Sequence, residues 1–487
     1  MSSDSTVPAT ALAGVRPHIE ALSDRFIALA NDIWDHPELR WEEHYSSAAQ
    51  IAAATALGAR ITREIGDIPT AFTAEWGQGG PVLAFLGEFD ALDNLSQKAG
   101  AVTREPNPDS SATCGHGCGH NLLGSGSLLA AAALARALEE KGLPGTVRYY
   151  GCPAEEAAAG KTFMVAAGAF DDVAAAISWH PGDGLTTSQN LMLAYTQVVF
   201  RFKGVASHAG AAPQHGRSAL DAAELMNVGV NFLREHMDDA DRIHYAFLDA
   251  GGASANMVQP TAALYYIIRS PKVASMRALY ERVVKVAEGA AHMTETELEV
   301  DFEGACAEIL PNRALEEFLH ATMCELGGIP FDDADQAFGR LIEQSLPVGA
   351  AAKGRAMRGL SPDALPYYTG VEPLVDPARR TQLTGSSDVG DVSWVVPTVQ
   401  VMGGTLVLGT PFHSWQVVAQ GKSTPAHKGM VHVATALAAT GLGLMLAPDV
   451  LAAARKEFDD VIAVTPYDNP LPEGLVAPPA RPGYQPA

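Results

Sequence analysis

The sequence is poor in basic residues and in cysteine. Its 487 residues include 33 lysines and arginines against 56 aspartates and glutamates, a formal net charge of −23. Nucleic acids and anionic membrane surfaces both require a basic face, so this balance argues against either partner. The 5 cysteines are too few, and odd in number, for a disulfide framework. They indicate a reducing compartment, and we expect a cytoplasmic protein.

Long apolar runs are also scarce. The N-terminus lacks the basic stretch and apolar core that are typical of a signal peptide. One run, VATALAATGLGLMLAPDVLAAA at residues 433–454, is long enough to consider as a membrane span. Pro448 and Asp449 favour instead two Ala/Leu-rich core helices that break at APD. With 47% hydrophobic and 18% charged residues, the composition is typical of a soluble globular protein.

The pattern of strands and helices predicts two kinds of domain. Short apolar strands alternate with helical stretches from residue 81, which indicates a mostly parallel sheet with helices on both faces. From residue 195 the order strand, helix, strand, strand, helix, strand predicts a βαββαβ ferredoxin-like unit. We therefore expect an α/β catalytic domain in two parts, residues 1–194 and 306–487, with an inserted lid and dimerisation domain at 195–305. The second part ends in a Pro-rich tail that we expect to be irregular.

One short motif, TCGHGCGHN at residues 113–121, concentrates metal-binding side chains: Cys114, His116, Cys118 and His120. Alternate residues of an extended strand lie ~6.6–6.8 Å apart, so all four could close on one zinc only in a tight coil, which the glycines permit. The cysteine spacing C-x-x-x-C does not match the C-x-x-C of redox pairs. Cys118 and His120, where the chain turns into a helix, could instead face one site whose other ligands come from elsewhere.

Further candidate ligands follow two apolar strands. Glu155 and Glu156 end the strand TVRYYGCPAEE, and His180 ends VAAAISWHPG. His413 lies far downstream in GTPFHSW, framed by turn residues. In open α/β sheets ligands bind at the carboxyl ends of the strands, which is where these residues fall. A solvated acidic edge and a core histidine are the alternative interpretations.

Several motifs occur together and in a fixed order: HGCGHN, PAEE, WHPG, GVASHAG, ANMVQP, GSSDVGDVSW and TPFHSWQ. Between IWDHPELRWEE, from residue 33, and AHKGM, ending at residue 430, the chain resembles the di-metal amidohydrolase family that includes aminoacylases, auxin-conjugate hydrolases and carboxypeptidase G. The resemblance implies an α/β catalytic domain with a βαββαβ lid through which two copies form a homodimer, with or without a second subunit type. It implies hydrolysis of an N-acyl amino acid, with p-aminobenzoyl-glutamate as the nearest example. A dipeptidase, another amino-acid-conjugate hydrolase and a non-catalytic metal-binding subunit are the alternatives.

The resemblance also implies roles for individual residues. Two divalent ions, zinc or manganese, would be held by Cys118, His120, Glu156, His180 and His413. Five ligands exceed the three that one catalytic ion usually takes, but suit two ions that share a bridging group, for which Cys118 is the candidate. Glu155 would be the general base, and His208 would reach the partner subunit's site to stabilise an oxyanion. Asn256 and Arg269 would hold the substrate's carboxylate.

Three more residues have supporting roles by this resemblance. Asp90, which ends FLGEFD, would orient a ligand histidine. His116 would be a spare ligand or support the ligands from behind. Asp388 lies in GSSDVGD, which replaces a more acidic loop of the family, so its role is open. Asn121 stands where many auxin-conjugate hydrolases carry aspartate.

Overall fold

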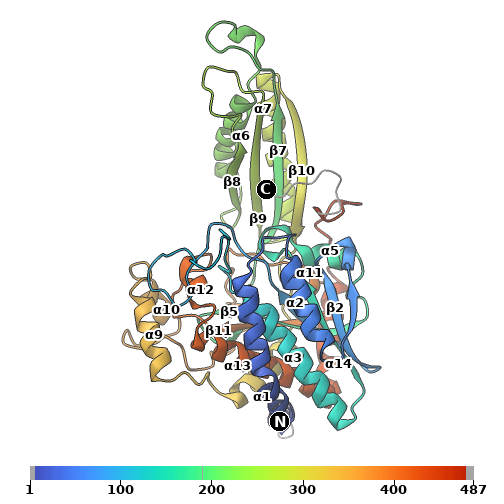
Figure 1. The fold of residues 1–487 in the computed structure, drawn as a ribbon. Coiled ribbons are helices and arrows are strands. Elements are labelled where there is room, and N and C mark those ends of the chain that lie inside the picture. The colour runs from blue at the N-terminus through green and yellow to red at the C-terminus, as the bar shows by residue number, and fades with distance from the viewer. Residues whose placement is uncertain (1–5, 189, 479–487) are drawn as a thin grey trace.

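The computed structural model describes residues 6–188 and 190–478. An α/β domain forms one body, and an elongated lid rises from one edge of it (Figure 1). The catalytic domain contains a seven-stranded sheet and the lid a four-stranded sheet. The predicted fold class, an α/β domain that carries an inserted βαββαβ lid, is therefore confirmed.

The large sheet has the strand order β1-β2-β4-β3-β5-β11-β6. Its four central strands run parallel, and the remaining strands pair antiparallel at the two edges. In sequence order the strands are β1 Arg60–Arg63, β2 Phe72–Gln78, β3 Val82–Glu88, β4 Gly145–Cys152, β5 Val173–Gly182, β6 Thr186–Thr187 and β11 Thr398–Gly404. The carboxyl ends of β3, β4, β5 and β11 thus meet along one edge of the sheet, below the lid (Figure 1).

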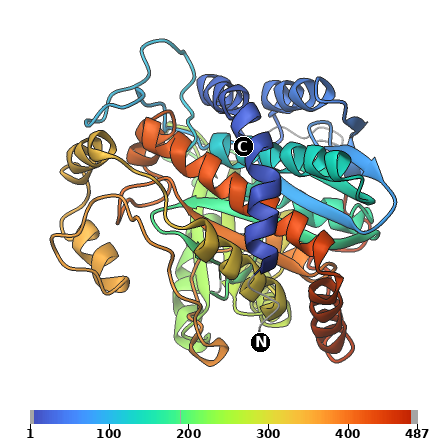
Figure 2. The same cartoon turned by 90° about the horizontal axis from the view of Figure 1, so that it is seen from below.

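Helices cover both faces of this sheet. Helices α1, α3 and α13 lie side by side across one face (Figure 2). The helices of the catalytic domain are α1 Thr6–Asp35, α2 His44–Thr55, α3 His120–Lys141, α4 Glu155–Ala158, α5 Gly160–Ala166, α8 Arg313–Leu326, α9 Asp333–Glu343, α10 Ala350–Met357, α11 Val389–Ser393, α12 Trp415–Gln420, α13 Thr424–Leu446 and α14 Pro448–Ile462. Helices α5 and α11 contribute to a second buried cluster on the opposite face.

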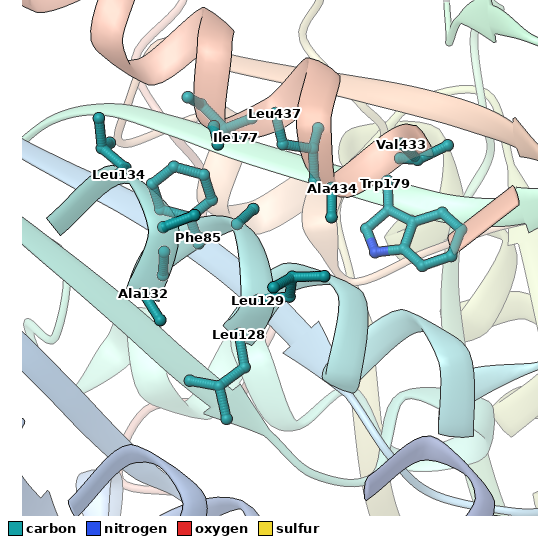
Figure 3. Close-up of a cluster of buried hydrophobic side chains, with 14 of the residues drawn as sticks. Phe85, Leu128, Leu129, Ala132, Leu134, Ile177, Trp179, Val433, Ala434 and Leu437 are labelled. Carbon is teal, nitrogen blue, oxygen red and sulfur yellow. The ribbon is translucent and has the colours of Figure 1, made fainter. Parts of the chain in front are cut away.

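The main core lies between the sheet and helices α3 and α13. Figure 3 shows Phe85 and Ile177 of the sheet packed among Leu134 of α3 and Leu437 of α13. Helices α3 and α13 are long and apolar enough to cross a membrane by length and composition, but 89% and 78% of their most apolar windows are buried. The break between α13 and α14 falls at Ala447, where Pro448 cannot continue the helix, as APD predicted. Most apolar side chains of residues 433–454 are thus buried inside the protein.

The lid consists of β7 Ala194–Lys203, α6 Ala219–Leu233, β8 Arg242–Asp249, β9 Thr261–Ser270, α7 Val273–Thr294 and β10 Glu297–Cys306. Its antiparallel strands have the order β10-β7-β9-β8. Helices α6 and α7 cover one face and enclose a separate core with the strands. Strand β8 is left at one edge, with only β9 as its neighbour.

After α14, described residues up to Ala477 pack against the catalytic domain. Between α14 and residue 477 the chain forms neither helix nor strand, in agreement with the irregular tail expected there. Residues 479–487 of the Pro-rich tail lie outside the described residues. Tyr467 nevertheless packs against the second buried cluster, and Leu471 belongs to it.

Candidate metal centre

The candidate ligands converge at the carboxyl edge of the large sheet. His120 is the first residue of α3, and Gly119 before it has a φ of 81°, which suits glycine. Glu156 lies in the turn that follows β4, and His180 lies near the end of β5. His413 comes from the loop before α12, and its N–H donates to Gly117 O at 2.9 Å. Segments about 300 residues apart are joined by this bond.

Two groups of three donors share one residue. The ligand atoms of Cys118, His120 and His180 lie within 4.8 Å of one another, and so do those of Cys118, Glu156 and His413. Each group offers the three ligands that a catalytic ion takes. Because Cys118 belongs to both groups, it could contribute to either ion of a two-ion site. The structure thus brings all five predicted ligands together.

Short contacts join the donors within each group. Cys118 Sγ lies 3.4 Å from His180 Nε2. His413 Nε2 lies 3.2 Å from Glu156 Oε2, although its side chain is 56% exposed. His413 has a φ of 56°, a left-handed conformation that is uncommon for a residue with a side chain. Such outliers cluster at functional sites, which fits a loop held in place for its histidine.

Asp90 contacts two of the predicted ligands at once. Its Oδ1 lies 2.9 Å from His120 Nδ1, and its Oδ2 accepts a bond from Glu156 N at 2.8 Å. With Nδ1 engaged in this way, Nε2 is the His120 nitrogen left to bind an ion. Asp90 thus contacts a predicted ligand histidine, and its orienting role stays a prediction.

The donor set suits divalent cations. Two buried atoms among the ligands, His120 Nε2 and Glu156 Oε1, have no hydrogen-bond partner. Burial, with the charge of Glu156, raises the pKa of Cys118 well above its ordinary value. The thiol therefore needs an adjacent cation to become a thiolate ligand. Mixed sulfur, nitrogen and carboxylate ligands are compatible with zinc and with manganese.

Glu155 lies beside the ligands and is partly buried. One of its oxygens falls within 4.8 Å of ligand atoms of Glu88 and His120. Burial, together with the carboxylates of Glu88, Asp388 and Glu156, raises the pKa of Glu155 well above its usual range. A carboxyl group whose pKa is raised holds a proton more readily, which suits it to exchange protons with substrate.

A buried ion-pair network that the sequence did not reveal supports the site. Lys161 Nζ lies 2.6 Å from Glu88 Oε1 and 2.6 Å from Asp388 Oδ1, and all three side chains are at most 1% exposed. Glu88 Oε2 in turn lies 3.3 Å from His120 Nε2. Asp388, whose role was open, thus reaches the ligands through Lys161 and Glu88. The signal in the sequence was an acid inside the apolar run VLAFLGEFD and a single lysine in AAAGKTFM.

Glu43 is another residue that sequence reasoning missed. It precedes α2, is fully buried, and accepts a bond from Ala154 N at 2.7 Å. Burial and the nearby charge of Asp90 raise the pKa of Glu43 to about 8. Nothing in WEEH distinguishes this buried glutamate from its exposed neighbour Glu42.

Not every residue of the histidine and cysteine motif joins the site. Cys114 Sγ donates to Pro37 O at 3.1 Å, and His116 Nε2 lies 3.2 Å from Ile33 O. Burial lowers the pKa of His116 to about 4, so its ring is neutral at pH 7. Within residues 6–188 and 190–478, neither residue belongs to a group of potential metal ligands. The single closed zinc knot is not formed.

The predicted lid residues lie at two opposite ends of the lid. Arg269 lies at the base, where its Nη1 donates to Ser386 Oγ at 3.2 Å. His208 and Asn256 lie beside each other at the far end, since Ala209 N donates to Asn256 O at 2.9 Å. Strand β9 runs roughly 30 Å between these ends. Within one chain, therefore, only Arg269 is near the metal centre.

The fold and the ligand clusters define a hydrolase of the metal-dependent type. Residues 84–351 match the model of peptidase family M20/M25/M40, and the chain belongs to this family. The resemblance inferred from the motifs is thereby confirmed.

Two curated relatives and one solved structure are similar to this chain over most of its length. The chain is 42% identical to one of the subunits of the p-aminobenzoyl-glutamate hydrolase of Escherichia coli, over 95% of this chain and 98% of that protein. It is 29% identical to the Xaa-Arg dipeptidase of Mus musculus, over 90% of each chain. The crystal structure of an aminobenzoyl-glutamate utilization protein from Klebsiella pneumoniae shares the fold, with a TM-score of 0.53 and 20% identity over 85% of this chain and 98% of that one. The chain is a hydrolase that acts on a C–N amide bond.

Proposed function

We propose that the chain cleaves the amide bond of an N-acyl amino acid, with p-aminobenzoyl-glutamate as the substrate to test first. The observation that carries this proposal is the convergence of five ligand side chains around shared Cys118, with Glu155 beside them. The 42% identity to the Escherichia coli p-aminobenzoyl-glutamate hydrolase chain supports the choice of substrate. Two bound divalent cations would polarise the scissile carbonyl and lower the pKa of water.

Glu155 has the position and the proton affinity of a general base. It takes the proton of the attacking water and returns a proton to the leaving nitrogen. Its neighbour Glu156 faces His413 at 3.2 Å and serves as a ligand, which leaves Glu155 free for proton transfer. Asp90 contacts both the His120 ring and the Glu156 backbone N–H, and it thereby fixes the positions of these two ligands relative to each other.

Positive charge at the base of the lid supports an anionic substrate. His244 lies close to Arg234, Arg242 and Arg269, and burial together with these three cations lowers its pKa. The Arg269 guanidinium also lies 5.7 Å from the centre of the Tyr195 ring, and its Nε is buried without a hydrogen-bond partner. In a chain with a net charge of −23, these arginines at the base of the lid favour a carboxylate over a cationic group.

His208 is prepared to donate from one defined nitrogen. Its Nδ1 accepts bonds from Gly210 N at 3.2 Å and Ala211 N at 3.1 Å. The proton of the neutral ring therefore resides on Nε2, which can donate to a developing oxyanion. Since His208 lies at the far end of its own lid, we propose that it acts in the partner subunit's site.

A homodimer through the lid would supply that arrangement. Leu225, Val228 and Phe232 form an apolar stripe on α6 and are 38%, 51% and 72% exposed. The neighbouring edge strand β8 exposes Phe247 and Leu248. An apolar helix face beside an unpaired strand edge is typical of a protein interface. Because the Escherichia coli relative is one subunit of its hydrolase, a second type of subunit is the alternative partner for this surface.

The proposal is tested with purified protein loaded with manganese or zinc. We expect release of glutamate and p-aminobenzoate, and two cations per chain by elemental analysis. Glu155→Gln should lower kcat by about 10²–10⁴-fold with the cations still bound, because it removes general base catalysis. Glu139→Gln, an exposed change on α3, serves as the matched control and should retain full activity. Retained activity in Glu155→Gln would refute the assignment of the base.

A substrate panel separates the alternatives. A dipeptidase would prefer dipeptides over the aromatic acyl-glutamate, and the panel should include dipeptides that end in arginine. The arginines at the lid base predict that these cationic substrates are turned over least. One tightly held zinc per chain without any hydrolysis would favour a non-catalytic metal-binding role instead.

A further inference from the structure

The turn that carries Glu155 and Glu156 has an unusual backbone. Ala154, just before α4, has φ and ψ of 57° and 43°, and Ala159, just after it, has 57° and 55°. Both are left-handed conformations, which residues with a Cβ atom rarely adopt. Such a turn persists only where surrounding contacts hold it.

Two buried acidic side chains accept hydrogen bonds from two backbone amides of this turn. Glu43 Oε1 accepts a bond from Ala154 N at 2.7 Å, at the first left-handed residue. Asp90 Oδ2 accepts a bond from Glu156 N at 2.8 Å, two residues further on. Glu155 lies between the two held amides.

Glu43 is itself fixed by a second contact. Its Oε2 accepts a bond from Thr70 Oγ1 at 3.1 Å, and its side chain is 0% exposed. Glu43 also lies outside the three groups of potential metal ligands found among the described residues. It therefore contacts the turn but belongs to no candidate metal site.

We propose that Glu43 is a positioning residue that holds the left-handed turn at Ala154 and thereby aims Glu156 at the cation and Glu155 at the substrate. The part that concerns Glu155 rests on the proposed function. The part that concerns Glu156 needs only cation binding, because residues that orient ligands typically change metal affinity by about 10–100-fold when removed. Metal affinity is therefore the primary measurement.

The experiment compares Glu43→Ala, Glu43→Gln and Glu42→Ala in the full-length protein. After chelation, each is titrated with Co²⁺ and the absorption of the bound ion is recorded, followed by kcat and KM at saturating metal. Glu42 is the exposed neighbour on the same loop and serves as the matched control. Glu43→Gln keeps an oxygen that can accept the Ala154 N–H bond.

We expect Glu43→Ala to weaken Co²⁺ binding by about 10-fold or more and to lower kcat with little change in KM. Glu43→Gln and Glu42→Ala should remain within about 3-fold of the unchanged protein on both measures, because glutamine keeps the oxygen that accepts the Ala154 N–H bond and Glu42 is exposed. Adding Ala154→Gly to Glu43→Ala should recover Co²⁺ affinity, since glycine adopts the left-handed conformation without needing a side chain to hold it. A general loss of packing would not be repaired by that second change.

Unchanged Co²⁺ affinity in Glu43→Ala would overturn the proposal, and so would an equal loss in Glu43→Gln. If Glu43→Ala fails to fold, Glu43→Asp takes its place in the same titration, with the same expected loss of Co²⁺ affinity, because the shorter acid cannot reach Ala154 N from the same position. If the protein proves inactive on every acyl amino acid, the Co²⁺ measurement still tests Glu43. Failure of the proposed function and failure of this proposal are thus distinguished.

Discussion

Replacing Lys161 with methionine tests how the buried charges behind the metal centre are balanced. The ammonium group lies 2.6 Å from an oxygen of Glu88 and 2.6 Å from an oxygen of Asp388. Although burial opposes its charge, the carboxylates of Asp388 and Glu88 raise the pKa of Lys161 well above its usual value. Lys161 is therefore charged, and its methionine replacement removes the cation while keeping most of the volume.

The loss of stability should be large because the carboxylates of Glu88 and Asp388 lose the ammonium group that both of them contact. Removing one partner of a buried ion pair costs about 3–5 kcal/mol, since the remaining charge stays uncompensated. Asp388 would keep the bond from Lys161 N, at 2.8 Å, which belongs to the backbone and survives the substitution. Among the described residues, the nearest cationic group left to Glu88 would be His120, whose Nε2 lies 3.3 Å from Glu88 Oε2 without a hydrogen bond between them. We therefore expect Lys161→Met to lower the free energy of unfolding by about 3–5 kcal/mol, a large part of a typical total.

The assay is urea unfolding followed by tryptophan fluorescence, with a chelator present so that cation binding does not add stability. Lys203→Met is the matched control, because Lys203 forms an ion pair of 2.7 Å with Glu299 but both side chains are more than half exposed. An exposed pair contributes little, so this variant should be indistinguishable from the unchanged protein. Equal, small effects of the two substitutions would refute the reasoning. Asp388→Asn combined with Lys161→Met should recover part of the loss.

Two further predictions concern pH dependence and assembly. Burial raises the pKa of Asp391 to about 7 from 3.8, so the folded state keeps a proton that the unfolded state has lost between these values. The contribution of Asp391 to the free energy of unfolding should therefore fall by at most about 4 kcal/mol as pH rises from about 4 to 7. In Asp391→Asn, urea unfolding at pH 5 and pH 8 should show a smaller difference in stability than in the unchanged protein. Phe232→Glu should convert a dimer into a monomer in analytical ultracentrifugation, because Phe232 is 72% exposed on the apolar stripe of α6, whereas Leu341→Glu on α9 should leave it intact. A dimer that persists in Phe232→Glu would place the interface elsewhere.

The alternation of strands and helices was enough to predict the main features of the fold. Parallel strands need helical crossovers, so alternating apolar runs and helical stretches indicate a sheet with helices on its faces. Ligands bind at the carboxyl ends of such strands. This rule predicted from the sequence that Glu156 and His180 would lie at the same edge of the sheet. The structure places both at that edge.

The motif at residues 113–121 shows where sequence reasoning stops. Its spacing could not decide which of four side chains face the site, because that depends on how the chain leaves its loop. Gly119, with a φ of 81°, turns the chain into α3 and presents Cys118 and His120 together, while Cys114 and His116 bond to backbone carbonyls. Whether a glycine adopts a left-handed conformation depends on the folded loop. The spacing of the cysteines and histidines in the sequence does not reveal it.

The sequence by itself determined the residue types, the order of the elements and the family, because these follow from patterns within one segment or between motifs in order. Only the tertiary structure decided which charges share a buried site. Glu43, Glu88 and Lys161 come from three segments that sequence patterns treat as unrelated, and each is buried only because its partner is there. Burying a charge is costly without a partner, so the fold has to bring the partners together before such residues can be identified.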